Sequence, residues 1–347
     1  MSRHYDYLIC GQGLAGSLLA RQLIKAGKKV LVMDAGSRNT SSHVAAGMFT
    51  PISGKRMVKS WMTDELYPVM TDTYRQLENE LGLSFLHLKN IQLSFSSIKE
   101  QNDFFSALTD KTSNYVLTEI VPNPGLQAPF GAVEITHSGW LNTSLFLDKF
   151  KAWLIEQQAY EQQCYAYESF LYADDQWHYG TELCAGAVVF CEGSQNSRNP
   201  FFKYAGVIEN KGDVFLLETN ALDDEKIYKR GAYAVHLEQN RFKAGSTYKW
   251  NEHDATPTST GYAELKAKTD ALISGNYQVL EHLAGIRPTT RDRRPILGGH
   301  HTEAGLYIFN GLGTKGVSLA PYFSKIMADL LLNGTILPAE IDVKRFT

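Results

Sequence analysis

Apolar runs and glycine turns alternate in a regular order at the start of the chain. Residues 5–10 form a short, mostly apolar run that ends in Gly-Gln-Gly-Leu-Ala-Gly, and residues 17–25 then carry apolar side chains at helical spacing. Gly27 ends this helical pattern, and a second apolar run follows at residues 30–33. The pattern predicts strand, glycine turn, helix and strand. Such a unit crosses right-handed and builds a parallel sheet.

The glycines of the first turn have the spacing of a dinucleotide-binding loop. Gly11 permits a tight turn, Gly13 lets the backbone approach a pyrophosphate, and Gly16 lets helix and strand pack closely. The phosphates would lie at the helix N-terminus, beside Leu14 and Ala15, where backbone N–H groups have no partner within the helix. The alternative is a glycine turn in an unrelated α/β protein, and the strands on both sides favour the dinucleotide.

An acidic residue at the end of the second strand completes the motif. Asp34 is placed to accept a hydrogen bond from a ribose 2′-hydroxyl, and its charge would repel a 2′-phosphate. Residues 38–51 then combine hydroxyl and small side chains, whereas nicotinamide enzymes continue here into another helix. Such a loop suits a chain that passes a second phosphate and a flat ring system. The cofactor-binding residues predicted in this region are Asp34, Ala35, Ser42, His43, Ala46, Gly47 and Met48.

Four further patterns continue this organisation along the chain. Residues 187–191 predict a buried strand that leads to a glycine, and residues 306–310 predict a last strand followed by a second glycine turn that opens a helix. Residues 144–154 read as an amphipathic helix. Residues 233–236 and 241–248 read as neighbouring antiparallel strands.

Composition and charge narrow the possible partners. The 347 residues are 44% hydrophobic and 20% charged, which excludes a disordered chain or a coiled coil. A net charge of −3 argues against nucleic acid as the default partner. The four cysteines form no CxxC pair and the histidines lack ligand spacing, so we expect no metal site and a reducing compartment. No apolar run approaches the roughly 20 residues of a membrane span, so we expect a cytoplasmic protein.

Together these motifs resemble the FAD-dependent oxidoreductases of the D-amino acid oxidase class. That class includes glycine oxidase, sarcosine oxidase and the FAD-binding half of an enzyme that completes a modified wobble uridine in tRNA. The likeness rests on the first glycine turn, the strand before Gly193, the Gly-Ile-Arg-Pro and Pro-Ile-Leu-Gly stretches of residues 285–298, and residues 306–321. It implies an α/β fold with a Rossmann-type FAD-binding domain and an interleaved antiparallel-sheet substrate domain. The expected boundaries are 1–80, 135–205 and 284–347 for the FAD-binding domain, and 81–134 and 206–283 for the substrate domain.

The resemblance also implies where the flavin is held. The helix after the second glycine turn can direct its N-terminus at the flavin N1/O2 edge, where negative charge appears on reduction. No cysteine follows Cys191, and Val44 rather than His43 stands where related enzymes attach the flavin, so the FAD is expected to be non-covalent. The cofactor-binding residues predicted in this half are Gly193, Arg287, Gly311, Gly313, Thr314, Lys315 and Gly316.

Four residues are predicted to act on the substrate. Arg287 stands where the class keeps its carboxylate-binding arginine, and the alternative is an ion pair within the charged loop that contains Asp292. Tyr233 matches the glycine oxidase tyrosine near the same end of the substrate. Lys243 is similar in position to the lysine that sarcosine oxidases present to the flavin for oxygen activation, and Tyr248 is placed to line the pocket.

The resemblance implies an enzyme that oxidises the C–N bond of a small amine or amino acid to an imine by hydride transfer to flavin N5. Oxygen or another electron acceptor would then reoxidise the flavin. Thr314-Lys315 replaces an arginine of glycine oxidases, which leaves the substrate open. Two alternatives remain: oxidation of a carboxymethylamino group on a modified tRNA uridine, and a flavin-binding protein without turnover.

Overall fold

The computed structural model describes residues 2–54, 57–250 and 252–347. It begins with the expected unit of strand, helix and strand, namely β1 (Arg3–Cys10), α1 (Leu14–Lys25) and β2 (Val30–Asp34). The helix begins at Leu14, earlier than its apolar pattern, because the extended backbone of Gly13 already acts as the N-cap. β1 pairs in parallel with β2 and with β14 (Leu183–Phe190), so the predicted parallel sheet is confirmed.

This parallel sheet is the centre of one half of the molecule. Its parallel strands run in the order β11, β2, β1, β14 and β22. The antiparallel strands β13 and β12 extend the sheet from the start of β14, and β21 pairs in antiparallel with β22. Helices α1, α3, α6 and α8 bury a large apolar cluster against one face. The bounds of these elements are β11 (Tyr160–Gln162), β12 (Phe170–Ala173), β13 (Gln176–Tyr179), β21 (Ile296–Gly299), β22 (Leu306–Asn310), α3 (Thr63–Leu81), α6 (Thr143–Glu156) and α8 (Gly316–Asn333).

A second, mostly antiparallel sheet forms the other half. Its core order is β15, β18, β17, β16, β7, β9 and β8, with β19 and β20 both paired to β15. Helix α7 (Ser259–Leu272) packs against one face, where Phe215 and Leu265 are fully buried. The strands are β7 (Ile91–Ser94), β8 (Val116–Leu117), β9 (Ala132–Ile135), β15 (Ile208–Glu218), β16 (Ile227–Arg230), β17 (Ala232–Glu238), β18 (Arg241–Gly245), β19 (Lys249–Trp250) and β20 (Gln278–Thr289).

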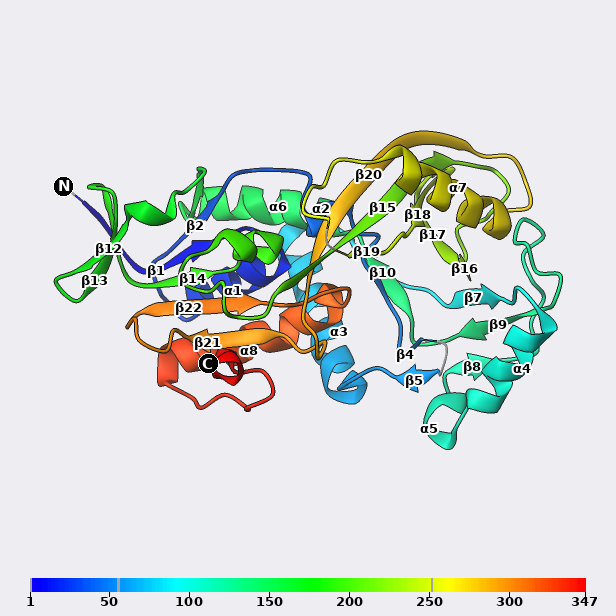
Figure 1. Cartoon of the computed structure of the whole chain (residues 1–347), viewed down its shortest axis with the longest axis horizontal. Helices are drawn as coiled ribbons and strands as arrows, with labels where there is room; N and C mark the ends of the chain where they lie inside the picture. The colour runs from blue at the N-terminus through cyan, green and yellow to red at the C-terminus, as the bar shows by residue number, and fades with distance from the viewer. Residues whose placement is uncertain (1, 55–56, 251) are drawn as a thin grey trace.

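Two long strands join the halves. Figure 1 shows β15 and β20 running side by side from the parallel-sheet half on the left to the α7 half on the right. Small elements fill the remaining surface between and beside the sheets. These are α2 (Ser41–Val44), β3 (Met48–Phe49), β4 (Ile52–Ser53), β5 (Val58–Lys59), β6 (Leu86–Leu88), α4 (Ile98–Ala107), α5 (Asp110–Ser113), β10 (Gly139–Leu141) and the 3₁₀ turns η1 (Tyr167–Ser169), η2 (Gly193–Arg198) and η3 (Val343–Phe346).

The predicted α/β fold class is confirmed, and one strand prediction needs correction. β17 and β18 pair in antiparallel as expected, but β18 ends at Gly245, so Tyr248 lies beyond it in the connection to β19. The domain division remains a prediction, because β9 and β20 each run across a proposed boundary. In the part of the chain that the structure describes, no helix is both long enough and apolar enough to cross a membrane.

Candidate active site

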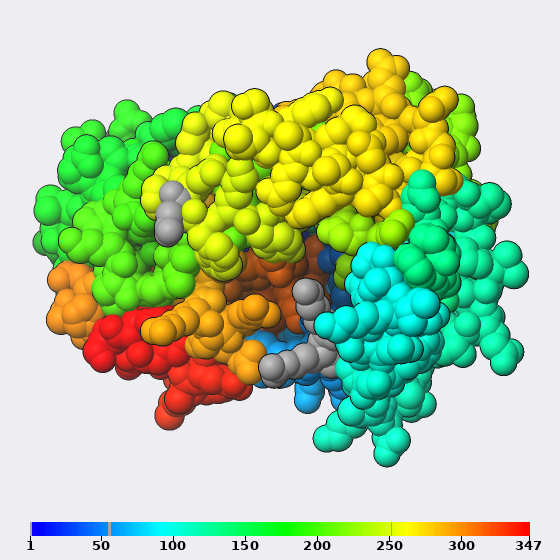
Figure 2. All heavy atoms as spheres, turned by 45° about the vertical axis from the view of Figure 1, so that its right-hand side comes forward, coloured from blue at the N-terminus to red at the C-terminus, as the bar shows by residue number. Residues whose placement is uncertain are grey.

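A cavity of about 810 Å³ lies between the two sheets, and both sheets contribute side chains to its wall. The carboxyl ends of β1, β2, β14 and β22 border it on one side. Strands β15 to β17 and β20 border it on the other. Figure 2 shows a hollow on this face, bordered by yellow, cyan and orange segments. The volume is of the size that cofactor and ligand sites have, and its position outside the carboxyl ends of parallel strands is typical of α/β proteins.

The first glycine turn forms a tight cradle at one end of this cavity. A Cβ on Gly11 would lie 2.5 Å from the Cys191 carbonyl oxygen, and a Cβ on Gly16 would lie 1.9 Å from the Gly11 oxygen, so both positions require glycine. No side chain caps the N-terminus of α1, whose first residues Leu14 and Ala15 line the cavity. These unpaired N–H groups and the positive helix end suit a diphosphate.

Asp34 fixes the edge of the same cradle. Its Oδ2 accepts a hydrogen bond from the Gln12 backbone N–H at 2.8 Å, and its Oδ1 accepts one from the Gly36 N–H at 2.6 Å. The carboxylate is thus held at the end of β2 and lines the cavity. This is the position that the sequence predicts for the contact with a ribose.

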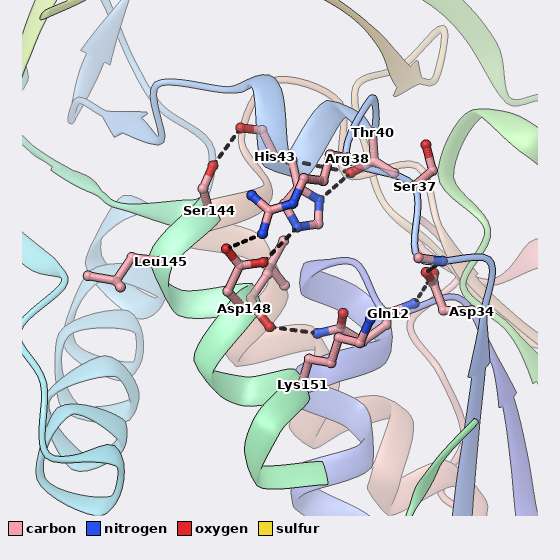
Figure 3. A network of polar contacts seen from close by, with 12 residues as sticks. Gln12, Asp34, Ser37, Arg38, Thr40, His43, Ser144, Leu145, Asp148 and Lys151 are labelled. Atoms are coloured by element: carbon pink, nitrogen blue, oxygen red, sulfur yellow. Dashed lines mark hydrogen bonds and ion pairs between the residues drawn. The ribbon is translucent and has the colours of Figure 1, made fainter. Parts of the chain in front are cut away.

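The segment after β2 passes along the cavity with its small side chains inward. Ser42, Ala46 and Met48 line the cavity, whereas the His43 ring turns away. Figure 3 shows the His43 ring directed at Asp148 of α6. Its Nδ1 lies 2.8 Å from the Thr40 hydroxyl oxygen. Burial lowers the pKa of His43, although Asp148 opposes this effect. A neutral imidazole packed on α6 is a structural contact of this segment.

The second glycine turn closes the cavity from the parallel-sheet side. Gly313, Thr314 and Gly316 line it, and Lys315 is the N-cap of α8, with no side chain capping the helix. Burial lowers the pKa of Lys315, and neighbouring arginines lower it further. Two uncapped helix N-termini therefore face one cavity, an arrangement that fits a cofactor with a diphosphate at one end and a ring that gains negative charge at the other.

Arg287 brings a positive charge into the cavity from β20. Its Nη1 donates to Asn210 Oδ1 at 2.8 Å and more weakly to the Thr247 carbonyl at 3.4 Å. The guanidinium lies on the backbone of Gly212, where a Cβ would be 2.0 Å from Nη2. Among the described residues it forms no ion pair, since Asp292 pairs with Arg345 at 3.2 Å instead. The guanidinium is held in place by these contacts, and no acidic side chain of the described ranges neutralises it. An arginine that binds an anionic ligand needs both properties.

Two tyrosines flank this arginine. Tyr233 on β17 places its hydroxyl against Gly245, and burial raises its pKa to about 12, so the hydroxyl stays protonated and can donate. The Tyr248 ring lies 4.5 Å from the Arg287 guanidinium carbon, while 57% of this tyrosine is exposed. Tyr248 therefore covers the arginine at the rim of the cavity, and the stacked ring orients the guanidinium plane.

Lys243 occupies a different environment. Its ammonium group donates to the backbone carbonyls of His43 and Ala45, at 3.0 Å each, and the residue is only 9% exposed. It does not line the cavity. Burial lowers its pKa to about 8. The side chain connects β18 to the end of α2, and its role in oxygen activation remains a prediction.

The structure thus gathers most of the predicted site residues around one cavity. Those that line it are Gly11, Gly13, Leu14, Ala15, Asp34, Ala35, Ser42, Ala46, Gly47, Met48, Gly193, Tyr233, Tyr248, Arg287, Gly313, Thr314, Lys315 and Gly316. Four others lie behind the lining, namely Gly16, His43, Lys243 and Gly311. Their individual roles toward a bound cofactor or substrate remain predictions.

Sequence reasoning missed several residues of this site. Asn210 and Gly212 support Arg287 from β15, and Lys229 enters the cavity from β16. Trp61 lines the cavity beneath the Arg294 guanidinium, which lies 4.1 Å from its ring. The only signal was Gly212 within an otherwise continuous strand pattern, which indicates a close approach by another group. A single lysine on a short strand gives none.

Comparison with known proteins identifies the family. Residues 6–330 match the DAO family of FAD dependent oxidoreductases. The chain belongs to this family. The predicted resemblance is thereby confirmed, and the cofactor is FAD. The uncapped helix termini and the glycine cradle described above are consistent with that cofactor.

Individual relatives cover nearly all of the chain at low identity. The chain is 23% identical to the glycine oxidase of Bacillus subtilis (strain 168), over 96% of this chain and 94% of that protein. It is also 23% identical to the tRNA 5-methylaminomethyl-2-thiouridine biosynthesis bifunctional protein of Azoarcus sp. (strain BH72), over 97% of this chain and 58% of that protein. The crystal structure of glycine oxidase from Bacillus cereus ATCC 14579 superposes with a TM-score of 0.80 at 22% identity, with 96% of each chain covered. This last similarity shows the fold.

Proposed function

We propose that this FAD-dependent oxidoreductase oxidises the C–N bond of a small amine that carries a carboxylate, that is, a free or N-substituted amino acid. The observation that supports this most strongly is the Arg287 guanidinium, which faces the cavity with no acidic partner among the described residues. A partly buried cation without an acidic partner favours a ligand that neutralises it, and a planar fork is the preferred partner of a carboxylate. The similarity to glycine oxidases supports the same substrate class.

The residues of this chain would orient the substrate. Arg287, fixed by Asn210, would hold the carboxylate, and the protonated Tyr233 hydroxyl would donate a hydrogen bond near the same end. Tyr248 would exclude water from the ion pair. The bound flavin supplies the acceptor for the hydride from the carbon that bears the nitrogen. Because this reaction needs a neutral amine and a fixed geometry more than acid–base groups, positioning is the main task of the protein.

We further propose that the FAD is held without a covalent bond. The His43 ring faces α6 rather than the cavity, and Cys10 and Cys184 are buried away from it. Cys191 lines the cavity beside Gly11 of the first glycine turn, at the diphosphate end. The fourth, Cys164, lies next to β11 at the Asp34 side of the cavity, away from the second glycine turn. Oxygen or another acceptor would reoxidise the flavin.

Anaerobic mixing of the holoenzyme with glycine, sarcosine and D- and L-amino acids tests the function. One member of the panel is expected to bleach the flavin absorbance, and Arg287→Met is expected to lower the second-order rate of bleaching by roughly 30- to 1000-fold, about 2–4 kcal/mol. Arg287→Lys should recover only part of this rate, because one ammonium group cannot reproduce the bidentate fork. The exposed Arg291→Met is the matched control. If dithionite bleaches the flavin and no amine does, the proposed substrate class is wrong.

A second candidate is the oxidation of a carboxymethylamino group on a tRNA uridine. It is supported by the Azoarcus relative and by the arginines Arg293 and Arg294 near the Lys315 edge of the cavity. The same Arg287 would then hold the carboxymethyl group of a much larger substrate. Salt-dependent binding of tRNA distinguishes the two candidates.

A further inference from the structure

Lys229 lines the cavity from the sheet that also carries the predicted substrate-binding residues. It lies on the short strand β16, directly opposite Tyr233 of β17. The row of paired residues continues from Tyr233 through Gly245 of β18 to Val214 of β15. Residues paired in this way point to the same face of a sheet, so Lys229, Tyr233 and Val214 share the cavity face.

Arg287 belongs to the same face at the other side of the row. On β20 it lies four residues beyond Leu283, the partner of Val214, and four residues is a whole number of pleats. Its guanidinium rests on Gly212, two residues before Val214. The cavity face of this sheet therefore carries a cation at each side, with the Tyr233 hydroxyl between them.

The ammonium group of Lys229 lacks the partners that neighbouring lysines have. Lys211 of β15 pairs with Glu252 at 2.9 Å, Lys226 pairs with Glu134 at 3.0 Å, and Lys243 donates to two carbonyls. For Lys229 no hydrogen bond and no ion pair is formed within residues 2–54, 57–250 and 252–347. Burial alone lowers its pKa, with no acidic group opposing the effect.

The ammonium group of Lys229 is partly buried and has no partner among the described residues, which is unfavourable, and its presence in a binding cavity calls for a ligand that compensates it. The carboxylate of the substrate is already accounted for by Arg287. We propose that Lys229 binds a second anionic group, so that the preferred substrate is a dianionic amine: an acidic amino acid or an N-substituted amino acid whose substituent ends in an acid. This inference rests on the proposed function, because it takes the Arg287 end as the site of the first carboxylate.

The sheet geometry sets the expected length of this substrate. Lys229 and Val214 lie three strand spacings apart, roughly 14 Å between backbones. The Arg287 guanidinium reaches back from β20 over Gly212 of β15, and both cationic residues line the same cavity. The two acidic groups should therefore be separated by several bonds. A substrate with acids on adjacent carbons would reach only one cation.

Isothermal titration of the FAD-loaded protein with thioether diacids tests this site without turnover, because a thioether has no C–N bond to oxidise. The probes are thiodiacetate, 3-(carboxymethylthio)propionate and 4-(carboxymethylthio)butyrate. Methylthioacetate, which has one carboxylate, is the reference. We expect the best diacid to bind at least about 10-fold more tightly than methylthioacetate, which is about 1.4 kcal/mol.

Variants test whether Lys229 causes the tighter binding of the diacid relative to methylthioacetate. Lys229→Met should reduce the preference to less than about threefold while methylthioacetate binds as before, and Lys229→Arg should keep it, since only the charge is needed. Lys226→Met is the matched control, because it removes the same charge three residues away outside the cavity lining. Arg287→Met should weaken all four ligands. Retained FAD absorbance verifies that each variant is folded.

Two results would overturn the proposal: no diacid binds more tightly than methylthioacetate to the wild type, or Lys229→Met leaves the preference intact. The outcome is separable from the fate of the proposed function. Bleaching by an amino acid with no Lys229-dependent preference would retain the proposed function and reject the second anion site. Lys229-dependent binding of diacids without bleaching by any amine would retain the second anion site and reject the proposed function.

Discussion

Lys243 illustrates how one buried charge links two segments of this fold and makes stability depend on pH. Its pKa falls to about 8 in the folded protein because burial disfavours the ammonium form, against an unfolded value of 10.5. Between these two values the unfolded chain binds more protons than the folded one. The free energy of unfolding should therefore rise as the pH increases from about 8 to about 10.5.

Lys243→Met should remove this rise. We expect the stability difference between wild type and variant to increase by roughly 2–3 kcal/mol across that window, as the shift of the lysine pKa implies. Urea unfolding at several pH values, with saturating FAD, measures it. If the free energy of unfolding changes with pH in the same way for both proteins, the Lys243 ammonium group keeps its ordinary pKa and its burial does not destabilise the charged form.

At the scale of elements, two glycines at the start of α1 have different roles: Gly13 is expected to serve cofactor binding, and Gly16 the packing of the fold. Gly13 has an extended backbone that any residue tolerates, and a Cβ there would approach only the Ser42 hydroxyl, at 3.4 Å. Gly13→Ala should leave the stability of the apoprotein within about 0.5 kcal/mol. It should weaken FAD binding by about 10-fold or more, since the added methyl group occupies the approach to a pyrophosphate.

Gly16→Ala is the contrasting variant, because its Cβ would lie 1.9 Å from the Gly11 carbonyl. It should destabilise the apoprotein by about 2 kcal/mol or more, a consequence of overpacking between α1 and β1. Thermal unfolding of the apoproteins and fluorescence titration with FAD give the two quantities. Equal effects of both alanines on stability would contradict the assignment of Gly13 to the cofactor.

The same scale shows what could be predicted from the sequence and what could not. Local patterns were sufficient for β1, α1, β2, β22 and the start of α8, because apolar periodicity and glycine turns act over a few residues. The lining by Lys229 and the support of Arg287 by Asn210 depend on strand order across the antiparallel sheet. Strand order is a long-range property, and no local pattern in one sequence contains it.

At the scale of the whole molecule, the charge is unevenly placed. The chain carries a net −3, yet among the residues that the structure describes four cations line the cavity, namely Arg198, Lys229, Arg287 and Lys315, against two acids, Asp34 and Glu192. The cations that the two sheets bring together create a local positive potential inside the cavity, although the protein as a whole is acidic. This arrangement favours small anionic ligands that can enter the cavity over long polyanions.

This distribution leads to a prediction about tRNA. Outside the cavity, Arg294 is already paired with Glu340 at 3.4 Å and Arg345 with Asp292 at 3.2 Å, so these two cations are less available to phosphates. We expect the holoenzyme to bind tRNA no more tightly than a non-specific complex, with a Kd above about 10⁻⁶ M at physiological salt.

Anisotropy titrations of labelled tRNA at about 50 and about 200 mM salt measure this affinity and its salt dependence. A tight complex that weakens steeply with salt, and weakens again in an Arg293→Ser/Arg294→Ser variant, would favour the tRNA uridine as substrate. In that case the carboxymethylamino group would still have to reach Arg287, so loss of flavin bleaching in Arg287→Met is expected for either substrate. The salt slope, rather than the arginine variant, therefore decides between a small amine and a tRNA.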